Sequence, residues 1–225
     1  MNKPWAASTL LFMLLTTGCA VEPFTREPLP ALKNPNPSAL RDSFARTIPN
    51  HFDSDDTVII EAPFNHDLEV LGVLRVDRTA GTFELIGLNP LAVKFFDLAS
   101  DRQGATIRYA ITPLLRHREI LLSIAQDIRR MYFDLTPSET AKAEVEPTMV
   151  RFTEKIPDGT LIYEFGGDPT VLLEKRLEGF FGAIWRVQYF QYTPDGTSLY
   201  PRGIVMDNSR FHYRIIVKNR DRTKD

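Results

Sequence analysis

The chain has 225 residues, and its 27 Lys and Arg residues nearly balance 29 Asp and Glu residues, so the formal net charge is -2. A hydrophobic content of 43% excludes a disordered chain, and the absence of a basic excess argues against nucleic acid as a partner. One cysteine can neither close a disulfide within the chain nor build a multi-cysteine zinc site. We therefore expect one monomeric globular domain without a metal or a cofactor.

Residues 1–18 have the features of a secretory signal peptide. Lys3 supplies a positive charge, and the largely apolar stretch from Ala6 to Leu15 follows it. This stretch is about half as long as a membrane-spanning helix requires. It ends in Thr16-Thr17-Gly18-Cys19, which resembles the lipobox of bacterial lipoproteins, except that Thr16 stands where Leu is usual.

The lipobox resemblance implies that Cys19 is acylated and that cleavage before it removes the signal peptide. Ala20 follows, whereas bacterial lipoproteins kept on the inner membrane tend to have Asp there. The resemblance therefore implies an anchor in the outer membrane, on its periplasmic face. The alternative is an ordinary cleaved signal peptide with an incidental cysteine. An unpaired thiol is rare in an oxidising compartment, which favours the lipid anchor.

Residues 19–50 are expected to form a tether between the lipid and a folded domain at residues 51–225. Prolines favour an extended chain and cannot pack inside a sheet, and this segment contains Pro23, Pro28, Pro30, Pro35, Pro37 and Pro49. Within the tether, Asn36-Pro37 predicts the start of a short helix that has Leu40, Phe44 and Ile48 on one side.

The domain at residues 51–225 is predicted to be mainly β-structure. Hydrophobic and polar residues alternate in about eleven segments, for example along residues 150–156, 161–165 and 211–217. Turn sequences such as Pro157-Asp158-Gly159 separate the segments. Short connections favour antiparallel pairing, so we expect a strongly curved antiparallel sheet that forms an incomplete barrel.

A helix is predicted midway along this domain, from Pro113 to Phe133. Thr112-Pro113 is a typical helix start, and apolar residues then recur at steps of three and four positions. The polar side of this helix is assigned to Asp127, Arg129 and Arg130. A second, polar helical segment is predicted from residue 136 to about residue 145. We expect the apolar stripe of the first helix to plug the concave face of the sheet.

This plan resembles the LolB-like and LolA-like outer-membrane lipoprotein superfamily, and within it a family of uncharacterised LolB-like lipoproteins. The local similarity runs from Gly72 to Leu98, where a strand enters Asn89-Pro90-Leu91 and returns; Ala92 follows where Gly is usual. Residues 200–206 and 211–217 resemble the closing hairpin of that fold. The resemblance implies an incomplete barrel with helices at its open side.

The same resemblance implies a hydrophobic cavity that accepts acyl chains of a lipid or lipoprotein, delivered by a periplasmic carrier protein. The predicted helix at residues 113–133 would be its lid or plug. The candidates for the cavity lining are Leu74, Leu85, Phe95, Ile107, Leu121, Ile124, Ile128, Phe152, Tyr163 and Trp185. The alternative is that these residues fill a solid core, and that the protein docks a partner of an envelope complex.

The predicted strand from residue 183 to 193 has aromatic residues on both of its faces. Strict alternation places Trp185 and Tyr189 on one face and Phe190 and Tyr192 on the other. One pair could line the cavity while the other contacts lipid headgroups or a partner. The alternative is a strand that is covered on both sides.

The sequence contains no nucleophile elbow, no zinc-protease motif and no phosphate-binding glycine loop. We therefore expect no catalytic residues and no enzymatic activity. The remaining enzymatic alternative is a lipid or thioester hydrolase. It would depend on an acid–base cluster of His66-Asp67 with Asp55-Asp56 and Glu61.

Overall fold

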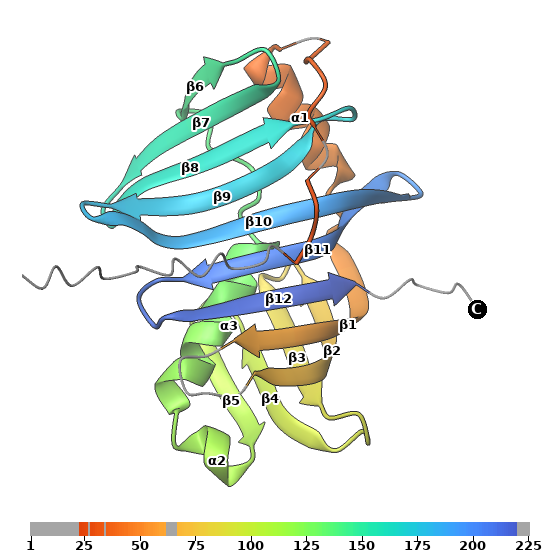
Figure 1. Cartoon of the computed structure of the whole chain (residues 1–225), viewed down its shortest axis with the longest axis vertical. Helices are drawn as coiled ribbons and strands as arrows, with labels where there is room; N and C mark the ends of the chain where they lie inside the picture. The colour runs from red at the N-terminus through yellow and green to blue at the C-terminus, as the bar shows by residue number, and fades with distance from the viewer. Residues whose placement is uncertain (1–22, 27, 34, 62–66, 220–225) are drawn as a thin grey trace, which may run out of the picture.

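The computed structural model describes residues 23–26, 28–33, 35–61 and 67–219. Twelve strands form one sheet in the order β5-β4-β3-β2-β1-β12-β11-β10-β9-β8-β7-β6, and every neighbouring pair is antiparallel. The sheet is curved but unclosed, with β5 and β6 as its two edges (Figure 1). The expectation of a mainly β, incomplete barrel is therefore confirmed.

The elements follow one another in two β-meanders that are joined through the helices α2 and α3. Their bounds are α1 Pro37–Thr47, β1 His51–Glu61, β2 Leu68–Asp77, β3 Thr82–Leu88, β4 Lys94–Ser100, β5 Ala105–Ala110, α2 Thr112–Leu115, α3 Arg118–Tyr132, β6 Lys142–Val145, β7 Met149–Ile156, β8 Gly159–Gly166, β9 Val171–Gly179, β10 Gly182–Asp195, β11 Ser198–Asn208 and β12 Tyr213–Asn219. The last strand returns beside β1 and joins the two meanders into one sheet.

Alternating burial gives the sheet one apolar face. Along β1, residues 52, 54, 56, 58 and 60 are buried, while residues 51, 53 and 55 are exposed. Antiparallel sheets with one face on the core have this pattern. The inner faces of all strands except β6 contribute to a single hydrophobic core, together with α1 and α3.

The structure has one strand more than the sequence predicts, and this additional strand, β6, corrects one local prediction. Residues 142–145, expected at the end of a second helical segment, form β6 and pair with β7 from Lys142 opposite Thr153 to Val145 opposite Val150. All four side chains of β6 are exposed. The residues Lys-Ala-Glu-Val alternate between polar and apolar, but neither face is buried, so backbone pairing with the edge of β7 determines this strand.

The short helix α1 is confirmed, including its start. The side chain of Asn36 accepts a hydrogen bond from the Ala39 amide at 3.1 Å. Leu40 and Phe44 are buried, and the Phe44 ring lies 5.2 Å from the Phe165 ring of β8. Because α1 packs on the core, the boundary predicted at residue 50 does not separate tether from domain, and the folded unit includes α1.

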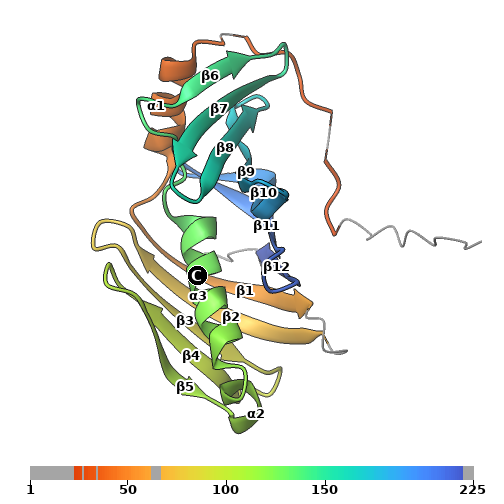
Figure 2. The same cartoon turned by 90° about the vertical axis from the view of Figure 1, so that its left-hand side faces the viewer.

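The helix predicted from Pro113 to Phe133 is divided in two. α2 ends at Leu115, and His117 interrupts the helical backbone with a ψ angle of 42° before α3 begins. The apolar residues Leu121, Ile124 and Ile128 of α3 are buried, as their spacing predicts. In the side view of Figure 2, the sheet curves around α3, and α1 lies near β6 to β8.

Candidate functional site

The ten residues predicted to line a cavity lie on the inner face of the sheet or on α3. Eight are buried in the core, and Phe95 and Ile107 are half-buried against it. The structure therefore brings all ten to one apolar core, but it fills the space between them with side chains of α1, α3 and the opposite strands. Their contact with a lipid stays a prediction.

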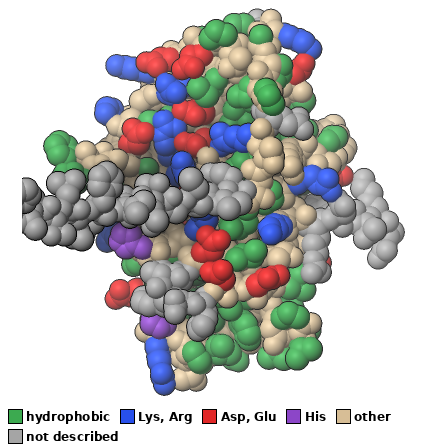
Figure 3. Space-filling view, viewed as in Figure 1, with side chains coloured by type: hydrophobic (Ala, Val, Ile, Leu, Met, Phe, Trp, Pro, Cys, Tyr) green, Lys and Arg blue, Asp and Glu red, His purple; other side chains and the backbone are tan. Residues whose placement is uncertain are grey.

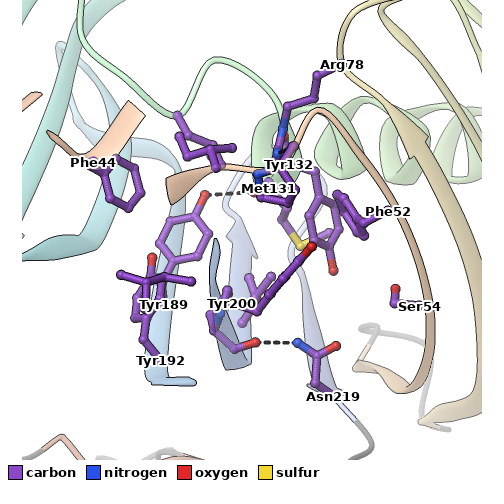
Figure 4. Close-up of a pocket in the computed structure, with 16 residues that line it drawn as sticks. Phe44, Phe52, Ser54, Arg78, Met131, Tyr132, Tyr189, Tyr192, Tyr200 and Asn219 are labelled. Atoms are coloured by element: carbon purple, nitrogen blue, oxygen red, sulfur yellow. Dashed lines mark hydrogen bonds between the residues drawn. The ribbon is translucent and has the colours of Figure 1, made fainter. Parts of the chain in front are cut away.

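A small pocket lies at another place, beside the carboxyl end of α3 (Figure 4). The volume of this pocket is about 40 Å³. This is room for a few waters, whereas sites for drug-sized ligands measure roughly 300–1,000 Å³. None of the ten predicted residues lines this pocket, whose lining is Phe44, Ile48, Pro49, Phe52, Ser54, Arg78, Met131, Tyr132, Leu135, Tyr189, Tyr192, Leu199, Tyr200, Pro201, Ile204 and Asn219.

Side chains of the sheet cap the carboxyl end of α3. The last carbonyls of a helix lack partners within the helix, and they carry its negative dipole end. Arg78 Nε donates to the Tyr132 carbonyl at 2.6 Å, and Lys175 Nζ donates to the Phe133 carbonyl at 3.1 Å. The hydroxyl of Tyr189 donates to the Met131 carbonyl at 3.0 Å (Figure 4). Both halves of the sheet therefore hold this end of the helix.

Of the two capping cations, Lys175 is buried and Arg78 is half-buried. Burial lowers the pKa of Arg78 to about 10 and the pKa of Lys175 to about 8. Within the described residues, neither forms a salt bridge with a carboxylate. Backbone carbonyls and aromatic rings contact them instead, since Arg78 lies 5.4 Å from the Phe52 ring and Lys175 lies 5.8 Å from the Trp185 ring. The charge of Asp134 also partly offsets the effect of burial on the pKa of Lys175.

A buried polar network holds the middle of α3. Asp127, which has no exposed surface, accepts hydrogen bonds from the Tyr213 hydroxyl at 2.5 Å and from Asn208 Nδ2 at 2.9 Å. Its other oxygen accepts from Arg130 at 2.5 Å. Ser123 joins the network through Tyr213 at 2.9 Å. Burial raises the pKa of Asp127, while these donors oppose the rise.

The assignment of Asp127 to the polar, solvent-facing side of the helix is therefore wrong. The sequence nevertheless indicates that Asp127 lies on the buried side of the helix, because Asp127 lies between Ile124 and Ile128 and four residues after Ser123. This spacing places Ser123 and Asp127 on one side of the helix. The sequence did not show the partners Asn208 and Tyr213, which lie more than eighty residues further along the chain.

The amino-terminal part of α3 is held differently. In the described part of the chain, hydrogen bonds between α3 side chains and the sheet begin at Ser123, and before it the apolar residues Ile120 and Leu121 pack on the core. Here β4, β5 and α2 meet at an apolar corner that we call the α2 corner. It combines the exposed residues Leu91, Val93 and Leu115 with the half-buried residues Phe95, Ile107, Leu114 and Ile120, while the exposed Tyr109 lies beside Lys94 on the other face of the sheet.

The predicted division of the aromatic residues of β10 is correct for three residues and wrong for one. Trp185 and Tyr189 belong to the inner core, while the Phe190 ring stacks on Phe24 outside it. Tyr192, however, lines the pocket together with Tyr189. The cause is Gln191, whose φ of 52° is left-handed and interrupts the alternation of side chains.

The acid–base cluster considered for an enzyme is not assembled by Asp55 and Asp56. Asp56 is buried on the inner face and accepts a hydrogen bond from Ser54 at 2.8 Å, whereas Asp55 is exposed on the opposite face. His66 lies outside the described residues. Across the residues that the structure describes, no group of three or more His, Cys, Asp or Glu could hold a metal ion. In the same part of the chain, no helix is long and apolar enough to cross a membrane.

Known proteins share the fold of this chain, which is a curved half-barrel around a helical plug. No protein-family model and no curated protein matches the chain. A solved LolA superfamily protein from Nitrosomonas europaea superposes with a TM-score of 0.51 at 6% identity, over 82% of this chain and 91% of that one. A putative outer membrane lipoprotein-sorting protein domain from Vibrio parahaemolyticus superposes with a TM-score of 0.47 at 8% sequence identity, over 82% of this chain and 89% of that one. The chain has a LolA/LolB-like fold.

Proposed function

We propose that this protein is a lipoprotein, anchored through Cys19 to the periplasmic face of the outer membrane, that binds acyl chains of a lipid or lipoprotein on the inner face of its half-barrel. The lipobox resemblance supports the anchor, and the LolA/LolB-like fold supports the class of ligand. The protein acts without catalysis in this proposal. A periplasmic carrier protein is the proposed donor of the ligand.

The observation that carries the proposal is the asymmetric attachment of α3. Its carboxyl end and its middle are fixed by Arg78, Lys175 and the Asp127 network. Its amino-terminal part packs on the core through the apolar residues Ile120 and Leu121, next to the α2 corner. An acyl chain offers the same kind of contact as these apolar side chains, so it can replace them without leaving a polar group unpaired.

This arrangement defines a mechanism of uptake. The fixed carboxyl end of α3 is the pivot, and α2 with the first turns of α3 moves away from β4 and β5. An acyl chain then enters at the α2 corner and covers the inner face beside Leu74, Leu85, Phe95 and Ile107. Burial of its apolar surface, about 25 cal/mol per Å², drives the transfer. In this proposal the packed core corresponds to the closed position of α3.

The α2 corner offers a test that leaves the core intact. We expect Leu115→Asp, at an exposed position on α2, to weaken uptake of a fluorescent fatty acid by about tenfold, because a carboxylate opposes an entering acyl chain. Val145→Asp is the matched control, since Val145 is similarly exposed but lies on β6 at the far edge of the sheet. Equal uptake by both variants, or none by the wild type, would contradict the proposal.

A second function has its own supporting observation. Phe180 and Phe181, at the tip of the β9–β10 hairpin, are 95% and 98% exposed, and their rings lie 5.0 Å apart. Exposed aromatic pairs are typical of sites that contact another molecule. Together with the filled inner face, they favour an accessory lipoprotein that docks a partner of an envelope complex.

The double variant Phe180→Ser, Phe181→Ser separates the two functions. If the protein docks a partner, we expect crosslinked envelope complexes of the wild type to disappear in this variant, because the hairpin supplies the contact. If the protein acts through lipid binding at the α2 corner, fatty-acid uptake by the variant stays at the wild-type level. Val145→Ser, at an exposed apolar position on β6, is the control for the crosslinking.

A further inference from the structure

Residues 23–33, which the sequence assigns to a free tether, lie against the sheet, with Phe24 on its outer face and Leu32 packed against the core. We call them the strap, with residue 27 outside the described part. The Phe24 ring stacks on Phe190 of β10 with 5.2 Å between ring centroids. Gly203 of β11 makes this seat possible, because a Cβ atom at that position would lie 2.5 Å from the Phe24 ring. A side chain in place of Gly203 would expel Phe24.

Polar contacts continue the attachment. The Arg26 guanidinium lies 5.2 Å from the centre of the Phe190 ring and 3.8 Å from a carboxylate oxygen of Glu174. The Leu32 amide donates to the Pro147 carbonyl at 2.9 Å, and Lys33 pairs with Asp168 at 2.5 Å. The strap therefore contacts β9, β10, β11 and the turns at residues 147 and 168.

Phe190 explains why the strap stays on the sheet. It is only 3% exposed, although it does not belong to the inner core. Around it the outer face is polar: Figure 3 shows acidic and basic side chains interspersed over β7 to β10. Among them, Glu164 pairs with Arg151 at 3.0 Å and with Arg176 at 2.9 Å. Release of the strap would expose an aromatic ring within a charged surface, which is unfavourable.

From these contacts we infer that the strap holds the outer face of β10 and β11 toward the lipid surface, so that the inner face turns away from the membrane and toward the periplasm. This inference rests on the proposed acylation of Cys19. Phe24 is the fifth residue after Cys19. Five residues reach at most about 18 Å when fully extended, so the seat of Phe24 lies within about 18 Å of the acylated residue.

This orientation deepens the proposed function. A carrier protein in the periplasm would meet the α2 corner directly, and the acyl chain would not have to cross the sheet. It also replaces the expectation that the proline-rich segment lifts the domain off the lipid. Only the residues before the strap remain as a spacer, and they are too few to let the domain reorient freely.

Fluorophores at two sites test the orientation in the full-length protein bound to vesicles that contain brominated lipids. If Cys19 is acylated, an introduced cysteine is the only free thiol for labelling. Lys218→Cys lies exposed beside Gly203 on the outer face, and Leu115→Cys lies on α2. We expect several-fold stronger quenching at residue 218 than at residue 115. Equal quenching, or stronger quenching at residue 115, would overturn the proposed orientation.

The strap itself is tested by variants and by trypsin. Gly203→Leu and Phe24→Ala should both release the strap, speed cleavage after Arg26 about tenfold and remove the difference in quenching. Phe24→Ala leaves the sheet unchanged, so misfolding of the Gly203 variant does not decide the result. Phe180→Ala, which removes an exposed ring elsewhere, should behave as the wild type. If trypsin cleaves Phe24→Ala at the same rate as the wild type, the strap is not held on the sheet by Phe24 and the inference is wrong.

The mass of the intact protein distinguishes this inference from the proposed function. An acyl mass on Cys19 with equal quenching at both sites refutes the orientation but leaves the anchor standing. Absence of the acyl mass refutes the anchor and the orientation together, while the trypsin result still reports whether the strap is attached. An acyl mass, unequal quenching and faster cleavage in Phe24→Ala together support the inference.

Discussion

Replacement of Asp127 by alanine is expected to lower the free energy of unfolding by about 3 kcal/mol or more. Asp127 is completely buried, and it accepts hydrogen bonds from Tyr213, Asn208 and Arg130. Its removal takes the carboxylate away from all three donors: Tyr213 and Asn208 are left to share Ser123 Oγ as an acceptor, and the partly buried Arg130 guanidinium loses its buried ion-pair partner. A buried donor without an acceptor destabilises the fold by the full free energy of its desolvation, which exceeds the small net stabilisation that an ordinary hydrogen bond provides.

Thermal and urea unfolding measure this effect. For a domain of this size, a loss of about 3 kcal/mol lowers the midpoint temperature by roughly 6–12 °C. Asp42→Ala is the control, because Asp42 pairs with Arg41 on the exposed side of α1 and should change the stability by less than about 1 kcal/mol. A similar, small effect of both variants would show that the network does not hold α3.

How far the sequence predicts this protein depends on the range of the interaction. The apolar stripe of α3 could be predicted from the spacing of Leu121, Ile124 and Ile128, because a helix brings these residues to one side through local geometry. The same holds for α1 and for the inner face of each strand. The fold class follows from such local patterns combined with short connections.

Contacts between distant residues could not be predicted in this way. The seat of Phe24 depends on Gly203 and Phe190, and six prolines in the same region favour an extended tether. A proline-rich segment cannot form a strand inside a sheet, but it can still pack on the surface of one. Arg78 and Lys175 escaped notice for a related reason: a cation is expected at the surface unless a helix end or an anion compensates it.

The predicted cavity residues show a third kind of limit. An alternating pattern identifies the side chains that leave water, but the same pattern serves a packed core and a site that opens for a ligand. Here the difference lies in how α3 is attached, with polar contacts from Ser123 onward and apolar contacts before it. Two helices fill the half-barrel, and the proposal that it opens depends on this difference between the two ends of α3.

Lys175 is expected to make the stability of the protein rise with pH above neutrality. Burial lowers its pKa from 10.5 to about 8 in the folded state, so the unfolded chain binds more protons between these two values. The cost of burying the charged amine is fully present below about pH 8 and is relieved as the pH rises toward 10.5. From pH 7 to about pH 9.5, the free energy of unfolding should increase by about 2 kcal/mol.

Lys175→Met tests this expectation, because methionine fills a similar volume and cannot titrate. Urea unfolding at several pH values should show no such rise in the variant, and its stability at pH 7 should equal or exceed that of the wild type. Lys155→Met, at an exposed position on β7, should retain the rise. Measurements should end near pH 9.5, because burial raises the pKa values of Tyr163, Tyr189 and Tyr213, and ionisation of these tyrosines in the unfolded chain opposes the effect above that pH. Persistence of the full rise in Lys175→Met would mean that another group titrates.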